Sequence, residues 1–146
     1  MVEHLRYHIT IDASPEKIWN ILWSPDTYTE WTIYFAEGSK IETDWTVGGR
    51  ALFLDHSGDG LITTILVYIP NHSVIFQYQG LLQGEVEDVS SPEVLEWQGA
   101  LEQYTLEEVE GKTVLTVDLE TTEAYQDMME QAFEHGLKRV KELAEQ

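Results

Sequence analysis

Residues 122–145 carry the pattern that most constrains the fold of this chain. Apolar side chains recur there at helical spacing, from Tyr125 to Ala144. On a helical wheel they cover an arc of about 180°, wider than the ~100° stripe of an ordinary surface helix. A helix of this length spans about 36 Å, so it needs an extended apolar partner surface. The segment therefore predicts one long helix packed against a sheet.

Alternating residues elsewhere in the chain predict that sheet. In residues 4–12, every second side chain from Leu5 to Ile11 is apolar, which is typical of a half-buried strand. Turn sequences such as Gly48-Gly49 and Glu110-Gly111 separate the later segments. We expect further strands near residues 37–43, 50–55, 61–69, 73–80, 98–108 and 112–120.

Two short helices are expected after the first strand. Ser14-Pro15-Glu16 combines an N-cap, a proline at the first helical position and an acid at the positive end of the helix dipole. Ser24-Pro25-Asp26 repeats this signal and opens a second helix that ends near Trp31. The chain is thus predicted to be a single α+β domain over residues 1–146. A curved antiparallel sheet of about seven strands surrounds the long helix.

Two segments leave structural alternatives open. Residues 81–97 have no clear periodicity, and Ser91-Pro92 lies in an acidic loop that is either fixed or a mobile flap. Gly136 interrupts the apolar face of the long helix, although glycine destabilises a helix by about 1 kcal/mol relative to alanine. It indicates close approach of a strand, which we favour slightly, or space for a ligand.

The charge balance excludes several classes of partner. The chain has 27 acidic and 8 basic residues and a net charge of −19, so it repels nucleic acid and anionic membrane surfaces. It lacks cysteine and any apolar run of the ~20 residues needed to span a bilayer. We therefore expect a cytoplasmic protein without a membrane or nucleic-acid partner.

No metal site, cofactor site or catalytic constellation is recognisable. His4 and His8 share a strand face but lie ~13 Å apart, too far for one ion. The segment from Asp55 to Gly60 imitates a calcium loop, but Leu66 stands where a bidentate glutamate belongs, so a hairpin turn is favoured. The sequence has neither a nucleophile elbow nor a phosphate-binding loop. We interpret the acidic residues of the strands as solvent-facing: Glu42, Glu102, Asp118 and Glu120.

Aromatic side chains are the remaining candidates for a site. An apolar pocket needs such walls together with a few fixed polar groups, which tyrosine hydroxyls can supply. Each ring can equally well fill the core. The candidate ligand-binding residues are Trp31, Phe53, Tyr68, Phe76, Tyr78, Trp97, Tyr104, Met129, Phe133 and Leu137.

A family resemblance extends these expectations. Its marks are the segment Ile9–Trp31 (ITIDASPEKIWNILWSPDTYTEW), the Gly48-Gly49 pair and the amphipathic C-terminal segment. Together they resemble the START-like (SRPBCC) superfamily, which has a helix-grip fold, and within it the homologues of the heat-shock protein 90 ATPase activator. The resemblance implies a cavity between sheet and long helix that binds apolar small molecules, in a carrier or in an enzyme. The family commonly has Gly-Trp in the last helix, where this chain has Gly136-Leu137.

The function expected from sequence is binding of a small apolar or amphipathic molecule in that cavity. One alternative is an enzyme acting on such a ligand, for example a cyclase, dehydratase or hydrolase. Another is a protein-interaction module that regulates a chaperone ATPase. The sequence does not name the ligand, and it leaves open whether the chain forms a homodimer.

Overall fold

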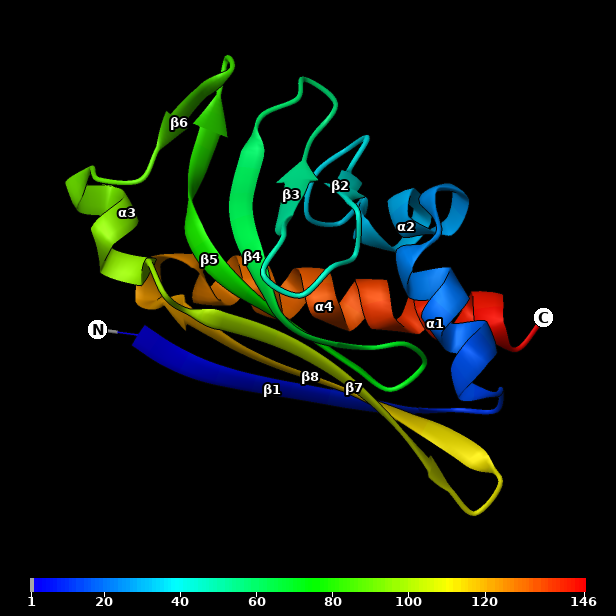
Figure 1. Ribbon diagram of the computed structural model, residues 1–146. Helices are drawn as coiled ribbons and strands as arrows, with labels where there is room; N and C mark the ends of the chain where they lie inside the picture. The colour runs from blue at the N-terminus through cyan, green and yellow to red at the C-terminus, as the bar shows by residue number, and fades with distance from the viewer. Residues whose placement is uncertain (1) are drawn as a thin grey trace.

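The computed structural model describes residues 2–146 and confirms the predicted α+β architecture (Figure 1). In chain order its elements are β1 (Val2–Ile11), α1 (Pro15–Trp23), α2 (Pro25–Thr32), β2 (Lys40–Thr43), β3 (Arg50–Leu54), β4 (Gly60–Ile69), β5 (Ser73–Gln83), β6 (Val86–Asp88), α3 (Pro92–Trp97), β7 (Leu101–Val109), β8 (Lys112–Thr122) and α4 (Glu123–Ala144). No helix within residues 2–146 is long and apolar enough to cross a lipid bilayer.

The strands form one antiparallel sheet with the order β1-β8-β7-β5-β4-β3-β2. The short strand β6 pairs only with the end of β5 and is additional to the expected seven. Register shifts in the β4–β5 pair, between Ile62 and Thr63 and between Ile65 and Val67, bend the sheet because bulges increase local twist. In Figure 1, β1, β7 and β8 run along α4, whereas β3, β4 and β5 rise away from it.

Capping explains where the short helices begin. The Ser14 side chain accepts a hydrogen bond from the backbone N–H of Lys17, and Pro15 occupies the first turn of α1. Ser24 ends α1 and precedes Pro25 at the start of α2, without a side-chain cap of its own. Both predicted helices are confirmed.

Residues 81–97 comprise the end of β5, β6 and α3 and do not form a single acidic loop. Ser91 caps α3 by accepting from the backbone N–H of Val94, which is fully buried. The Gln98 amide donates to the carbonyl oxygens of Gln79 and Val89, which ties α3 to β5. The serine–proline signal of the first two helices is thus present here a third time, and it begins a helix of only 6 residues that the sequence analysis does not predict.

The apolar face of α4 is narrower than the sequence pattern predicts. Its buried residues lie between Ala132 and Ala144 and include Phe133, Leu137 and Val140. Tyr125 and Met128, in the first half, are exposed. Burying each of the three large side chains contributes roughly 1.5–3 kcal/mol, so the segment that contains them anchors α4 to the domain.

Gly136 marks a close approach, but its partner is a helix. A Cβ atom there would lie 2.7 Å from the backbone oxygen of Trp31, at the end of α2. The expectation that a strand approaches this glycine is therefore wrong. Absence of the side chain lets α2 pack directly on α4, and this contact places α2 beside the cavity described next.

Candidate functional site

A cavity of about 230 Å³ lies between α2, α4 and the sheet. Helix α2 and the turn after it supply one wall, β3, the start of β4 and β7 supply the floor, and α4 supplies the opposite wall. The lining residues are Tyr28, Trp31, Thr32, Phe35, Ala36, Ser39, Phe53, Leu54, Asp55, Asp59, Gly60, Leu61, Glu102, Tyr104, Met128, Met129 and Phe133. The walls are thus mainly aromatic and aliphatic, with polar groups at a few positions.

The structure brings half of the predicted ligand-binding residues to this cavity. Those that line it are Trp31, Phe53, Tyr104, Met129 and Phe133. Phe76 does not line the cavity but is fully buried next to it, with its ring centroid 4.9 Å from that of Phe53. These five lining residues therefore converge where α2, β3, β7 and α4 meet.

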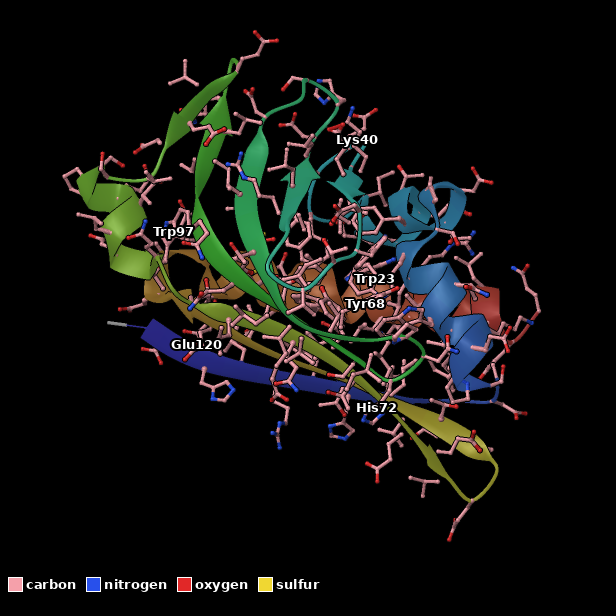
Figure 2. The ribbon with its side chains drawn as sticks, in the orientation of Figure 1. Trp23, Lys40, Tyr68, His72, Trp97 and Glu120 are labelled. Carbon is pink, nitrogen blue, oxygen red and sulfur yellow. The ribbon has the colours of Figure 1, made fainter. Side chains whose placement is uncertain are left out.

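The other predicted residues lie elsewhere. Tyr68 stacks on Trp45, with ring centroids 5.3 Å apart. Tyr78 and Trp97 belong to a separate apolar cluster beside α3. Figure 2 shows Trp97 at α3, well away from Trp23 and Tyr68. Leu137 lies in a second, shallower depression against Tyr7 and Ile9 of β1.

Aromatic contacts hold the cavity walls in place. The Trp31 indole N–H donates to the backbone oxygen of Leu22 at 3.1 Å, which fixes the ring. Phe35 packs edge-on against Phe133, with ring centroids 4.8 Å apart, and so joins the α2 and α4 sides. Phe35 is absent from the predicted set. It lies in the turn after α2, which ends at Thr32, so no helical spacing marks it in the sequence.

Glu102 is the polar centre of the cavity, and the expectation that it faces solvent is wrong. Its exposed fraction is only 8%. The Tyr78 hydroxyl donates to one carboxylate oxygen, and the Tyr104 hydroxyl donates to the other at 2.6 Å. The burial pattern of β7 puts Glu102, Tyr104 and Leu106 on the same inward face. Strict alternation of side chains along β7 from Tyr104 predicts that Glu102 faces inward, whereas its charge alone suggests exposure to solvent.

Burial controls the protonation of this cluster. It raises the pKa of Glu102 above its ordinary value, and the hydrogen bonds from Tyr104 and Tyr78 oppose that shift. Burial also raises the pKa of Tyr28, Tyr78 and Tyr104, and the nearby Glu102 carboxylate adds to each increase. The three phenols therefore keep their protons at neutral pH, and the carboxyl group is the titratable member of the cluster.

The rim of the cavity contains a tight hairpin turn between β3 and β4. Asp55 accepts hydrogen bonds from the backbone N–H groups of Ser57 and Asp59 and from the Ser57 hydroxyl. These bonds lower the pKa of Asp55, the Ser57 hydroxyl having the largest effect. Asp59 in turn accepts from the backbone N–H of Gly84. The prediction of a hairpin turn at this segment is confirmed.

The described residues contain no cluster suited to a metal ion. Nowhere in residues 2–146 do three or more histidine or acidic side chains converge in the geometry of a metal site. The side chains that line the cavity supply a buried carboxyl group, the phenols of Tyr28 and Tyr104, and apolar walls.

A curved antiparallel sheet packed around a long C-terminal helix defines a domain of the START-like, helix-grip class. Residues 12–145 match the sequence model of the family described as Activator of Hsp90 ATPase homolog 1-like protein. The chain belongs to this family. No curated protein matches the sequence significantly.

Solved structures support the same fold. The Aha1 dimer from Colwellia psychrerythraea, a solution structure, is 24% identical with a TM-score of 0.74, over 98% of this chain and 96% of that one. Protein MLL2253 from Mesorhizobium loti is 17% identical with a TM-score of 0.73, over 97% and 96% of the two chains. Protein CV1439 from Chromobacterium violaceum is 18% identical with a TM-score of 0.68, over 98% of each. At these identities the likeness concerns the fold alone.

Proposed function

We propose that the protein binds a small, largely apolar molecule in the cavity between α2, α4 and the sheet. The observation that carries the proposal is a cavity of about 230 Å³ whose walls are mainly aromatic and aliphatic. Protein cores normally leave few voids larger than a water molecule. A space of this kind, with a few fixed polar groups, is typical of a ligand site.

The volume limits the size of the ligand. An apolar cavity of about 150 Å³ accommodates benzene, so 230 Å³ suits a molecule of about nine or ten non-hydrogen atoms. Met128 and Met129 border the space, and flexible thioether side chains can adapt to different apolar shapes. The neutral compound 2-phenylethanol has the right size and serves as a first probe.

Calorimetric titration with 2-phenylethanol tests the proposal. The wild-type protein is expected to bind one molecule saturably. Met129→Trp places an indole at the cavity wall and should abolish binding, whereas Gln131→Trp adds the same group to an exposed position of α4 and should leave it intact. Absence of binding by the folded wild-type protein, or equal binding by both variants, contradicts the proposal.

Native mass spectrometry of the purified protein addresses the identity of the ligand. We expect a co-purifying adduct with the mass of a small organic molecule, and its loss in Met129→Trp. An adduct that persists in Met129→Trp is bound outside the cavity.

Glu102 favours a second candidate function, an enzyme that acts on the bound molecule. A buried carboxyl group with a raised pKa is typical of general acid–base catalysts. Cyclase, dehydratase or hydrolase reactions all require such proton transfer. For a candidate substrate, Glu102→Gln should lower the rate by roughly a hundredfold or more. A turnover rate that Glu102→Gln leaves unchanged refutes this second function.

A homodimer is proposed as the assembly. Its support is that the similar Aha1 protein from C. psychrerythraea is described as a dimer. Light scattering coupled to size-exclusion chromatography should give twice the mass of one chain, and a mass of one chain at all concentrations contradicts the dimer.

A further inference from the structure

Most hydrogen-bond donors around the cavity are already committed to acceptors within the protein. The Trp31 indole N–H and the Thr32 hydroxyl donate to backbone oxygens of α1 and α2. The Ser39 hydroxyl donates to the backbone oxygens of Ala36 and Thr32. These side chains therefore have no proton to offer to a ligand.

Glu102, in contrast, can still accept hydrogen bonds from a ligand. A carboxylate has about four lone-pair positions, and the hydroxyls of Tyr78 and Tyr104 occupy two of them. Among the described side chains that line the cavity, the Tyr28 hydroxyl is the one donor without an acceptor. It lies near enough to Glu102 for the carboxylate to raise the pKa of Tyr28. The part of the cavity beside Glu102 thus presents more acceptors than donors, which suits a ligand head group that donates.

The charges around the cavity also favour a ligand head group that donates hydrogen bonds. Asp55, Asp59 and Glu102 are among the described lining residues, which include no lysine, arginine or histidine. Hydrogen bonds keep Asp55 ionised by lowering its pKa. The whole chain carries a net charge of −19. The electrostatic potential at the cavity therefore repels anions and attracts cations.

The aromatic walls are compatible with a cation as well as with an apolar body. Trp31, Phe35, Phe53 and Phe133 line the space, and Phe35 and Phe133 pack together at its side. Aromatic ring faces attract ammonium groups, most strongly where water is excluded. An ammonium group near Glu102 would leave its hydrocarbon part against these rings.

We propose that the ligand is a small organic amine, and that Glu102 binds its protonated amino group by a charge-assisted hydrogen bond. The inference rests on the proposed function, because it specifies the chemistry of the molecule that the cavity binds. The positive charge of the ammonium group favours the ionised form of Glu102, which burial alone disfavours. The ammonium group donates to the free lone pairs of this carboxylate, and Tyr78 and Tyr104 hold it in position.

Three probes of nearly equal size and different charge test the inference on the wild-type protein. They are 2-phenylethylamine, 2-phenylethanol and phenylacetate, titrated by calorimetry at neutral pH and about 0.3 M salt to screen the overall charge. We expect the amine to bind at least about tenfold more tightly than the alcohol, because hydrogen bonds to charged groups are the stronger ones. Phenylacetate should show no binding.

A matched pair of variants locates the effect. Glu102→Gln and Glu108→Gln each remove one negative charge from β7, but Glu108 is exposed. Glu102→Gln should weaken binding of the amine by at least about tenfold and change that of the alcohol by less than about twofold. Glu108→Gln should change neither affinity.

The outcomes separate this inference from the proposed function. Equal affinities for amine and alcohol, or equal losses in Glu102→Gln and Glu108→Gln, refute recognition of an amine while cavity binding stands. If the wild-type protein binds none of the probes, the proposed function itself fails. The comparison of probes uses only the wild-type protein, so it remains decisive even where Glu102→Gln does not fold.

Discussion

Truncation of Phe133 to alanine tests the packing around the cavity. The ring is 1% exposed and lies 4.8 Å from Phe35 and 5.3 Å from Tyr7, centroid to centroid. Removing a buried phenylalanine side chain typically destabilises a protein by about 3–5 kcal/mol. One side of this ring already borders the cavity, where it has no packing partner, so we expect a loss near about 3 kcal/mol.

Guanidinium denaturation followed by tryptophan fluorescence measures this loss, with the slope checked against that of the wild type. Met128→Ala is the control, because Met128 borders the same cavity from the same helix but is 44% exposed. It should lower the free energy of unfolding by less than about 1 kcal/mol. If Phe133→Ala is no more destabilising than Met128→Ala, the packing of α4 described above is incorrect.

Four further predictions follow from the structure. Gly136→Ala should lower the melting temperature, because the new Cβ would lie 2.7 Å from the Trp31 oxygen, and a higher melting temperature would disprove the close approach. Leu137→Trp should destabilise the protein by about 1–3 kcal/mol through overpacking but leave its affinity for 2-phenylethanol unchanged, because Leu137 lies outside the main cavity. Weaker binding of 2-phenylethanol would contradict this placement. In urea denaturation, Glu102→Gln should become more stable relative to the wild type as the pH rises above 4.5, because Glu102 retains its proton in the folded wild type but releases it in the unfolded chain. A relative loss of stability would show that folding lowers the pKa of Glu102. Dialysis against a chelator should leave the melting temperature unchanged, and a large drop would reveal a metal site.

Local sequence signals predict most of the fold. The apolar periodicity of residues 122–145 predicts α4 to within one residue at each end, because a long helix repeats its signal many times. The serine–proline caps at Ser14 and Ser24 predict the two short helices for the same kind of local reason. The equivalent cap at Ser91 is a weaker signal, because α3 is too short to repeat an apolar periodicity after it.

The site was predicted only in part. Alternation and helical spacing identify Trp31, Phe53 and Phe133 as inward residues, but every inward ring shares that property. Which rings border empty volume depends on how α2 and α4 sit over the sheet, which is a tertiary property. The charge of Glu102 predicts exposure to solvent, whereas its position two residues from Tyr104 on the same strand predicts the inward orientation that the structure has.

The most direct measurement of the central claim is an NMR spectrum of the protein with bound 2-phenylethanol. Intermolecular nuclear Overhauser effects report protons of the ligand that lie close to protons of the protein. Binding in the cavity predicts effects between the phenyl ring of the ligand and both the Met129 methyl group and the Phe133 ring. Effects to Leu137 and Ile9 instead, in the depression beside β1, would contradict the account.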